Sequence, residues 1–506
     1  MFNKNSILKK NSLFNTVNLN KNKILRKNFS QNKFKKKYGN FYSGIYIYIY
    51  NKLFERNLSN FYKAKNFKKI NKSNRVTSKV NLIIWILINK FLFLSKILVI
   101  LIFKKKTTYK NKKIILQSPF EYSNQMSFTH LINRKNRKNF YFLIKTFDQS
   151  YQRTIEQLYG SKNVINIYDL VKISDIFKTI SFCFKNFKKI SSFKKIFLFN
   201  KIDFIKSFLI SNKNYFDYLL YVRILKLINP KKCLIMSSIG NEMLIAAIKD
   251  KTKVDLLGYA VQGVSFTAQS LTSQFLFNSV DELYCYGMAD YNHFKNISKK
   301  SEFIFPKKIF ICGSVRDFHY NKKRRFSNTS KKLKVSYLKS NTIWFGNMDG
   351  YYVNLFTKIL ETKFKNKFYY QIKERKNFIS DDVKYLIKND YINKKNVLID
   401  KKMLTEKIIF DSDIIVGTIS TSLIYQSLYY NKIIIQLGSN NFPWATNLSY
   451  LGILCAKNEE EIIRLLKNIL FSPKYVKTIK KNQNFMLKNL ISKRNAINTI
   501  LYHMDK

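Results

Sequence analysis

The stretch Asp411–Gly438, DSDIIVGTISTSLIYQSLYYNKIIIQLG, decides the fold class of this chain. Ile414–Val416 is a short β-branched run followed by Gly417, which is typical of a buried parallel strand. The hydroxyl-rich turn Thr418–Ser422 precedes residues at helical spacing, and a second strand starts at Ile433–Gln436. Strand, turn, helix and strand make one βαβ unit, so the stretch predicts a parallel α/β sheet. A helix that begins at the carboxyl end of such a strand is suited to anionic ligands.

Length and composition set the frame for the rest of the chain. The 506 residues have room for two ordinary domains and an appendage, and the formal net charge is +62. The abundant Lys, Asn, Ile, Phe and Tyr have A/T-rich codons, so genome composition explains part of this bias and weakens an inference to nucleic acid. The five Cys are scattered without a CxxC pair, which indicates reduced core thiols in a reducing cytosol. The four His lack ligand spacing, so we expect no metal cage.

Residues 1–80 are rich in Lys and Asn, with Glu55 as the single acid. Short apolar patches there lack a sustained helical period. The composition predicts a basic, poorly ordered arm, either simply solvated or attracting anionic lipid or RNA.

Residues 81–110 contain the most apolar stretch, Asn81–Phe103. Its length fits a membrane-spanning helix, but Lys90 and Lys96 fall near its middle, and each costs about 2.5–3.5 kcal/mol at a bilayer centre. We therefore expect a membrane-associated helix that lies in the cytoplasmic leaflet, with a helix packed on the globular body as the alternative. The corresponding location is the cytoplasmic face of the cell membrane.

Regular α/β patterning begins near Lys113 and runs through two cycles, which predicts an α/β fold with two Rossmann-like domains facing across a cleft. The first domain is expected at 111–320 and the second at 335–490, with the basic segment Phe318–Thr342 as a linker. The predicted strands are Ile114–Gln117, Phe140–Thr146, Val164–Tyr168, Lys232–Ser237, Leu256–Val261, Glu282–Tyr286, Ile309–Cys312, Ile343–Phe345, Phe368–Lys373 and Val397–Ile399. The predicted helices include Gln149–Tyr159, Tyr351–Thr362, Asp381–Asn389, Leu404–Asp411, Glu459–Leu470 and Pro473–Ser492.

The order of short motifs resembles a known group. A strand ending in SPFE is followed by YAVQGV, a strand ending in YGM, IFICGSVRD, a strand ending in QIKERK, and then the opening stretch. Over about Lys113–Leu487 this order is similar to GT-B glycosyltransferases of surface-carbohydrate synthesis, particularly polysialyltransferase-like and capsule-type enzymes. The resemblance implies two Rossmann-like domains, a nucleotide-activated sugar held mainly by the C-terminal domain, and an acceptor held by the N-terminal one.

The same resemblance implies donor-binding residues. The Gly–Ser–Thr nucleotide turn of the family corresponds to Gly417, Ser420, Thr421 and Ser422. Its KPHP-like segment corresponds to a stretch that reads Lys373-Glu374-Arg375 here, and Gln262-Gly263 stands where relatives often have His-Gly.

Side-chain chemistry supports parts of this set. Hydroxyls and backbone N–H groups at 420–422 suit an anion at a helix start, although a plain N-cap has the same pattern. Lys373 and Arg375 can neutralise a leaving nucleotide, or can be solvated charges of a basic chain. Glu374 can bind a ribose or base group.

A base for the acceptor hydroxyl is expected at Glu121, because this acid directly follows the first predicted strand. The alternative for Glu121 is a carboxylate at a helix N-terminus, and Glu242 and His130 are reserve candidates. The remaining candidates are expected to line the cleft: Gln262, Gly263, Gly313, Ser314 and Arg316.

Asp411-Ser412-Asp413 matches a DxD metal motif in letters only, since it precedes a strand instead of following one. We therefore expect a metal-independent enzyme without a cofactor, in which the nucleotide-sugar is a co-substrate. P-loop, GxGxxG and nucleophile-elbow motifs are absent from the sequence.

The sequence thus predicts a glycosyltransferase that moves a sugar from a nucleotide-activated donor to a glycan or glycolipid in cell-surface polysaccharide synthesis. An anionic membrane surface is an expected partner and nucleic acid is not. The alternative is a basic nucleic-acid-binding protein of the organellar ribosomal type without catalysis. A degenerate GT-B protein that only binds sugar is the third hypothesis.

Overall fold

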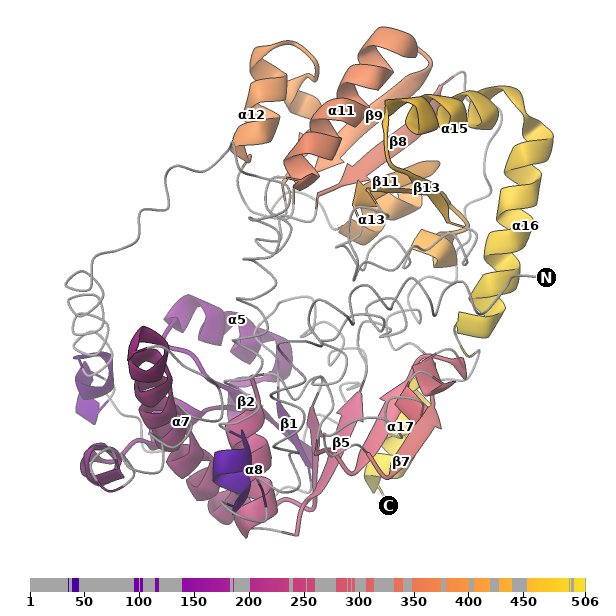
Figure 1. Ribbon diagram of the computed structural model, residues 1–506. Helices are drawn as coiled ribbons and strands as arrows, with labels where there is room; N and C mark the ends of the chain where they lie inside the picture. Colours follow the sequence, from indigo (N-terminus) through magenta and orange to yellow (C-terminus); the bar gives the residue numbers. More distant parts are fainter. Residues whose placement is uncertain are drawn as a thin grey trace.

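The computed structural model describes two parallel α/β sheets, which Figure 1 draws as separate bodies one above the other. The expected α/β class with two Rossmann-like units is confirmed by these sheets. The described residues are 35, 39–44, 95–99, 101–102, 114–117, 139–182, 185, 201–235, 240–251, 253–259, 279–288, 290–292, 294–295, 306–313, 332–339, 348–374, 379–399, 405–418, 427–438, 453–490, 492 and 496–505.

The first sheet has seven described strands, all parallel, in the order β3-β2-β1-β4-β5-β6-β7. Because the chain winds outward from β1 in one direction and then from β4 in the other, the topological switch point lies between β1 and β4. The strands are β1 Ile114–Gln117, β2 Phe140–Ile144, β3 Val164–Asn166, β4 Lys232–Ile235, β5 Asp255–Tyr259, β6 Glu282–Cys285 and β7 Lys308–Ile311.

Helices cover both faces of the first sheet, because its strands are apolar on both sides. Tyr141 and Leu143 of β2 join the core under α7 and α8, while Phe142 and Ile144 join the core under α5 and α17. The helices are α5 Gln149–Tyr159, α7 Lys201–Ile228, α8 Glu242–Lys251 and α17 Ala496–Asp505, with 3-10 turns η2 Ser161–Asn163 and η3 Ile167–Leu170.

The second sheet has the order β10-β9-β8-β11-β12-β13, again with every pair parallel. Counted from its own first strand this is 3-2-1-4-5-6, the dinucleotide-binding order, with the switch point between β8 and β11. The strands are β8 Leu333–Leu338, β9 Phe368–Lys373, β10 Val397–Leu398, β11 Ile414–Thr418, β12 Ile433–Leu437 and β13 Leu454–Ala456.

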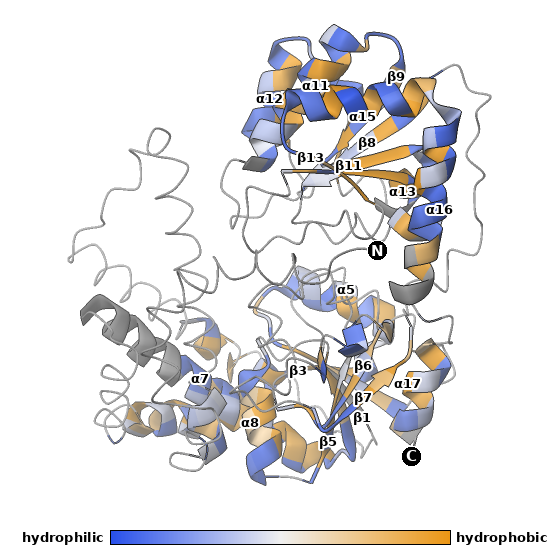
Figure 2. Cartoon of the chain, turned by 45° about the vertical axis from the view of Figure 1, so that its right-hand side comes forward, coloured by the Kyte–Doolittle hydropathy of each residue, from blue (hydrophilic) through white to orange (hydrophobic). Residues whose placement is uncertain are grey.

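The larger core of the second unit lies under α11, α12 and α15, where Val335 and Tyr337 of β8 face these helices. The other face of the sheet packs Leu338 and Ile415 against α13. Figure 2 shows the strands of the second sheet as mostly hydrophobic, whereas α16 carries many hydrophilic residues. The elements are α11 Met348–Lys363, α12 Asp381–Lys388, α13 Thr405–Asp411, α15 Glu459–Phe471 and α16 Pro473–Leu490, with η7 Lys394–Asn396 and η8 Ser427–Tyr430.

The last helix, α17, belongs to the first unit although it follows the second in sequence (Figure 1). Ala496, Ile500 and Met504 are buried in the core that also contains Phe142. The Nζ of Lys232 donates a hydrogen bond to the carbonyl of His503, which attaches the end of the helix to β4.

Three elements depart from the sequence-based expectation. β8 lies within Phe318–Thr342, which we expected to be a linker, and that expectation is wrong for Leu333–Leu338. Its Leu, Val and Tyr alternate with Lys and Ser, so a Lys-rich composition concealed a period of two. β13 and α17 were not expected, and the predicted strand Ile343–Phe345 lies outside the described residues.

Part of the expected basic arm is an ordered anchor. Residues 39–44 form a helical turn in which Phe41 and Tyr42 are buried, and Asn40 Nδ2 donates to Asp250 Oδ1 at 2.6 Å. The rings of Phe41 and Tyr218 lie 5.0 Å apart, centroid to centroid, so the turn docks on α7. The expectation of a poorly ordered arm is therefore wrong for this turn, because aromatic burial offsets the ordering entropy.

Part of the apolar segment also packs on the first unit. Within the described residues 95–99 and 101–102, Ile97 is buried in the core and Lys96 Nζ lies 5.7 Å from the centre of the Phe147 ring. Leu98 and Ile102 are exposed. None of the helices that the structure describes has both the length and the apolar character needed to cross a membrane.

Candidate functional site

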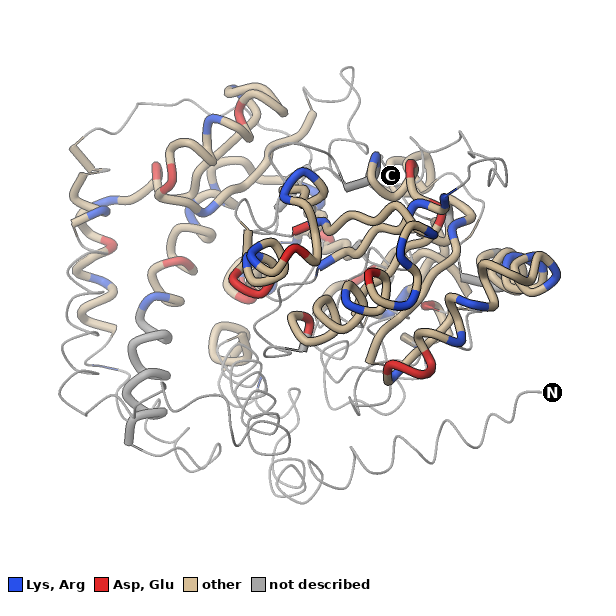
Figure 3. The backbone as a smooth tube through the Cα atoms, turned by 90° about the horizontal axis from the view of Figure 1, so that it is seen from above, with Lys and Arg blue, Asp and Glu red and all other residues tan. Residues whose placement is uncertain are grey.

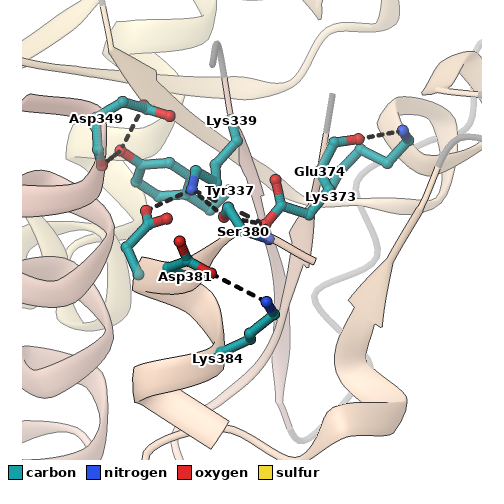
Figure 4. A network of polar contacts seen from close by, with 9 residues as sticks. Tyr337, Lys339, Asp349, Lys373, Glu374, Ser380, Asp381 and Lys384 are labelled. Carbon is teal, nitrogen blue, oxygen red and sulfur yellow. Dashed lines mark hydrogen bonds and ion pairs between the residues drawn. The ribbon is translucent and has the colours of Figure 1, made fainter. Parts of the chain in front are cut away.

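The candidate site lies at the carboxyl edge of the second sheet, where β8, β9 and β11 end side by side. Leu338 pairs with Lys373 on one side and with Gly417 on the other, so the residues that follow these strands meet at one edge. The helices α11 and α12 begin at the same edge, as the close-up in Figure 4 shows. The site therefore combines strand ends with helix N-termini, the usual ligand edge of an open α/β sheet.

Lys339 connects three elements of this edge. Its backbone N–H donates to the carbonyl of Lys373 at 3.0 Å, which extends the β8–β9 pairing by one residue. Its Nζ lies 2.5 Å from Ser380 Oγ, hydrogen-bonds Asp382 and lies 3.9 Å from Glu374 Oε1 (Figure 4). A buried ammonium needs such partners, because an unpaired buried charge is costly.

Glu374 is fully buried, and the start of α12 surrounds its carboxylate. Glu374 Oε1 accepts hydrogen bonds from the backbone N–H of Ser380 at 3.0 Å and from the Ser380 hydroxyl. Its own backbone N–H donates to the carbonyl of Leu398 at 2.8 Å. The structure thus places Glu374 as an anchor for the first turn of α12, while the predicted contact with a ribose or base stays a prediction.

Lys373, the last residue of β9, is 3% exposed. Its Nζ donates to the backbone carbonyl of Glu374 at 2.6 Å. The side chain is therefore a buried cation beneath the site in this structure, and neutralisation of a leaving nucleotide by direct contact remains a prediction. It is not one of the solvated surface charges that a basic chain has in number.

Asp349, in the first turn of α11, joins the two central strands. Its Oδ1 accepts a hydrogen bond from Thr418 Oγ1 at 3.0 Å and one from the Tyr337 hydroxyl at 3.2 Å. Burial, and after it the Asp349 carboxylate, raises the pKa of Tyr337 well above its ordinary value, so the phenol is a neutral donor. The contact between Asp349 and Thr418 spans the switch point between β8 and β11.

Two glycines let backbones approach at this edge. A Cβ on Gly350 would lie 3.0 Å from Asp382 Oδ2, so Gly350 allows the starts of α11 and α12 to meet. Gly438, just after β12, has a φ of +80°, and a Cβ there would lie 2.6 Å from Tyr352 Cε2. Gly417 was expected to bound its strand, but it lies inside β11 and pairs with Gln436.

The carboxyl edge of the first sheet has its own buried pair. Lys145 directly follows β2, and its Nζ lies 3.0 Å from Asp217 Oδ2 on α7. Burial lowers and Asp217 raises the pKa of Lys145, and the net shift is upward, so the amine stays charged. The Tyr168 hydroxyl donates to Asp217 Oδ1 at 3.5 Å.

Other candidates are placed as follows. Gly313 follows β7 with a φ of +92°, and its N–H donates to the backbone carbonyl of Cys285 at 3.4 Å. Glu242 is buried in the first turn of α8, near the switch point of the first sheet. The reserve candidate His130 lies outside the described residues. So do the following predicted site residues: Glu121, Gln262, Gly263, Ser314, Arg316, Arg375, Ser420, Thr421 and Ser422.

The DxD-like segment lies at the opposite, amino edge of the second sheet. Asp413 Oδ2 accepts a hydrogen bond from the Lys334 N–H at 2.9 Å, and Ser412 Oγ lies 2.6 Å from Ser336 Oγ. The first of these contacts joins the starts of β8 and β11. Across the described part of the chain, His, Cys, Asp and Glu side chains form no group of three or more placed to hold a metal ion.

Sequence analysis missed Lys339, Asp349, Asp217 and Lys145. Lys339 and Asp349 were hidden because β8 was taken for a linker, so the residues after it had no strand end to follow. Lys145 follows a correctly predicted strand in a chain with 92 Lys and Arg, where one more Lys is a weak signal. Asp217 is an acid in the long basic and apolar helix α7, which is a usable signal for a buried partner.

No family profile and no curated protein sequence matches this chain. Solved structures with a similar course of the chain include a putative UDP-N-acetylglucosamine 2-epimerase from Listeria monocytogenes, at 8% identity over 78% of this chain and 96% of that one, with a TM-score of 0.49. The UDP-GlcNAc 2-epimerase from Neisseria meningitidis bound to UDP-GlcNAc has 11% identity, coverage of 77% and 98%, and a TM-score of 0.49. A glycosyltransferase from Rickettsia africae has 11% identity, coverage of 78% and 98%, and a TM-score of 0.45. The likeness concerns the fold, and no site residue is transferred from it.

Proposed function

We propose that this chain is a GT-B glycosyltransferase that moves a sugar from a nucleotide-activated donor to a glycan or glycolipid acceptor. The observation that carries the proposal is the 3.0 Å contact between Thr418 Oγ1 and Asp349 Oδ1 at the switch point of the second sheet. Open α/β sheets bind their ligands outside the carboxyl ends of the strands at such a point. A chain with two such sheets has one edge for a donor and another for an acceptor.

The donor edge offers the positive ends of two helices. α11 and α12 begin beside Thr418 and Lys339, and a helix N-terminus stabilises phosphate charge through its N–H groups and dipole. The hydroxyl residues Ser420, Thr421 and Ser422 follow Thr418 by two to four positions in sequence. In this proposal they hold the phosphates, and the buried network around Lys339 fixes the start of α12 against the ends of β8 and β9.

The transfer step then needs a base for the acceptor hydroxyl and stabilisation of the negative charge on the leaving nucleotide. The acceptor hydroxyl oxygen attacks the anomeric carbon, its proton passes to a carboxylate, and the bond from that carbon to the phosphate oxygen breaks with the electron pair leaving on the nucleotide. The proposed base is Glu121, which follows β1 in sequence, with Glu242 beside the same switch point as the reserve. The leaving nucleotide is stabilised at the donor edge.

We place the enzyme in cell-surface polysaccharide synthesis on the motif order alone. Metal independence belongs to the same proposal, and the position of Asp413 supports it, because its carboxylate is bound to the backbone of Lys334 at the edge opposite the donor. The nucleotide-sugar is a co-substrate, and no further cofactor is proposed.

The test is ligand-induced thermal stabilisation of the full chain against CMP, CDP, UDP and GDP at fixed ionic strength. UDP belongs in the panel because six of the similar structures have UDP or a UDP-sugar in their names. Specific binding stabilises by RT ln(1 + [L]/Kd), about 2.7 kcal/mol at a hundredfold excess over Kd, so one nucleotide should raise the melting temperature above the rest.

Variants decide where the nucleotide binds. The shift should disappear in the double variant Ser420→Ala/Thr421→Ala and persist in Thr362→Val, a change at an exposed position of α11. Equal shifts for all four nucleotides, together with RNA binding that falls steeply with salt, would contradict the proposal and favour the nucleic-acid-binding alternative.

A further inference from the structure

An exposed apolar stripe runs along the helix formed by residues 173–182 in the first unit. Ile173, Phe177 and Ile180 are spaced i, i+4 and i+7, which places them on one helix face. Their exposed fractions are 61%, 66% and 48%. Three large apolar side chains in a row, all facing water, distinguish this face from the scattered single exposures that are normal for proteins.

The opposite face of this helix is fixed to the body. The Asp175 carboxylate is fully buried and receives both guanidinium NH groups of Arg223, at 2.5 and 2.6 Å. Asp175 Oδ2 also accepts the N–H of Lys172 at 2.9 Å, so the acid caps its own helix. At the other end, the ring of Phe182 stacks on Tyr215 with centroids 3.9 Å apart. The helix therefore presents its apolar stripe in a fixed orientation.

Positive charge surrounds the stripe. Lys172, Lys178 and Lys185 are exposed on the same segment. The ring of Phe41 lies 5.5 Å from that of Phe182, centroid to centroid, so the ordered anchor 39–44 packs on the end of this helix. The 38 residues that lead into the anchor contain eleven Lys or Arg and neither Asp nor Glu. Figure 3 shows that Lys and Arg also occur on several other helices.

We propose that the face made by Ile173, Phe177 and Ile180 docks on an anionic phospholipid surface. The apolar side chains leave water for the boundary between headgroups and acyl chains, and each nearby Lys strengthens binding roughly fivefold by attraction to acidic headgroups. A second copy of this chain is disfavoured as the occupant, because two bodies with a net charge of +62 repel each other. The stripe offers a single aromatic ring and no hydrogen-bonding group, whereas RNA recognition combines stacking on several aromatic rings with hydrogen bonds to base edges.

Two parts of the chain would contribute to membrane binding in different ways. The basic arm attracts any anionic surface, whereas the stripe requires one with an apolar interior. The inference does not depend on the donor or acceptor of the proposed enzyme, so it can fail while the glycosyltransferase proposal holds.

Tryptophan probes in the full chain provide the test. Phe177→Trp and Phe471→Trp place a reporter at two comparably exposed positions, 66% and 72%, on different units. Each variant is mixed with vesicles of phosphatidylcholine alone or with 30% phosphatidylglycerol, with and without brominated acyl chains. Emission is measured as the difference from the parent protein, which has three Trp of its own. We expect a blue shift and bromine quenching for the probe at 177 on anionic vesicles, and neither for the probe at 471.

A second variant checks the energetic role of the stripe. Ile173→Ser/Phe177→Ser/Ile180→Ser should lower the vesicle partition coefficient at least tenfold at moderate salt, whereas Phe471→Ser should leave it within twofold; circular dichroism and melting confirm that both variants are folded. A probe at 177 that stays unquenched while the protein sediments with vesicles would overturn the proposal and leave the arm as the sole attachment. Absence of vesicle binding would also overturn it, as would self-association that the triple variant abolishes.

Discussion

The ammonium of Lys339 lies 3.9 Å from the carboxylate of Glu374, and neither side chain is more than 2% exposed. Asp382 supplies a second carboxylate to the same ammonium. One lysine at the end of β8 thus joins the end of β9 and the first turn of α12. The geometry of the proposed donor edge depends on this buried group of charges. The effect of removing the Lys339 ammonium on the stability of the protein can be measured without any ligand.

Lys339→Met is expected to destabilise the protein by about 3–5 kcal/mol, because it leaves two carboxylates without their buried cation. Urea unfolding measures the loss. In a double-mutant cycle, Glu374→Gln should lower the free energy of unfolding much less in the Lys339→Met variant than in the parent protein. Lys384→Met is the control, since Lys384 and its partner Asp381 are exposed, and additivity at Lys339 and Glu374 would refute the coupling.

Thr418→Val is expected to weaken nucleotide binding by about tenfold, because valine keeps the shape of threonine but removes the donor to Asp349, a net loss on the order of 1 kcal/mol or more. Calorimetric titration with the nucleotide that stabilises the native chain gives the dissociation constant. Thr362→Val changes the same chemistry on an exposed turn of α11 and should bind like the parent. Unchanged affinity in Thr418→Val would place the donor elsewhere.

Lys480→Met should stabilise the fold at pH 7, by an amount on the order of 1 kcal/mol once its partial exposure is discounted. Burial, and then the nearby Lys432, lowers the pKa of Lys480 to about 8, while Asp413 opposes the shift. Below pH 8 both states carry the proton and the charged amine disfavours folding in full. The unfolded chain then binds more protons between about pH 8 and 10.5, so the parent regains stability as pH rises and the advantage of the variant vanishes. The free energy of unfolding of both proteins is measured across pH 6.5–10.5. A difference between them that stays constant over this range would contradict the prediction.

The thiols of Cys233, Cys285 and Cys312 should stay unmodified by a disulfide reagent at pH 8 until the protein unfolds. All three thiols are buried, so the reagent cannot reach them. Burial also raises the pKa of each thiol, so little of the reactive thiolate is present at pH 8. Cys455 is partly exposed and should react earlier. Mass spectrometry after timed labelling assigns the sites, with Cys455→Ser as the matched control. Fast labelling of Cys233 in the native protein would show that the first core opens readily.

Ile500→Ala should destabilise the protein by about 2–5 kcal/mol, because Ile500 is fully buried against the first sheet and the change leaves a cavity. Tyr502→Ala, two residues away and 57% exposed, is the control and should cost far less. Urea unfolding followed by near-ultraviolet dichroism measures both. Equal effects would mean that α17 packs on the sheet only loosely.

Much of the fold was predictable from the chain because strong local patterns coincide with tertiary burial. Gln149–Tyr159 and Phe368–Lys373 were predicted with the observed bounds, since an Asp148 cap starts the first and an aromatic-rich run forms the second. β8 was missed because Lys334 within the strand and the lysines on either side of it resemble a linker. β13 is only three residues long, too short for a periodic signal.

The site was predictable only in part. The position of Lys373 at the end of β9 followed from the strand, but its burial and the engagement of Glu374 by Ser380 depend on how α12 folds back, which no spacing in the sequence reveals. Asp349 is separated from Thr418 by 69 residues, and only the parallel order of β8 and β11 brings them together. Contacts across a switch point are by nature non-local, so a single sequence leaves them open.

The return of α17 to the first sheet has a consequence for biosynthesis. The strands of the first sheet leave the ribosome well before α17, because the whole second sheet is translated in between. At roughly 5–20 residues per second, the face that contains Phe142 waits on the order of ten seconds or more for its last helix. During that interval the apolar face that α17 later covers lacks its last helix, so the earliest-made sheet is the last to be completed.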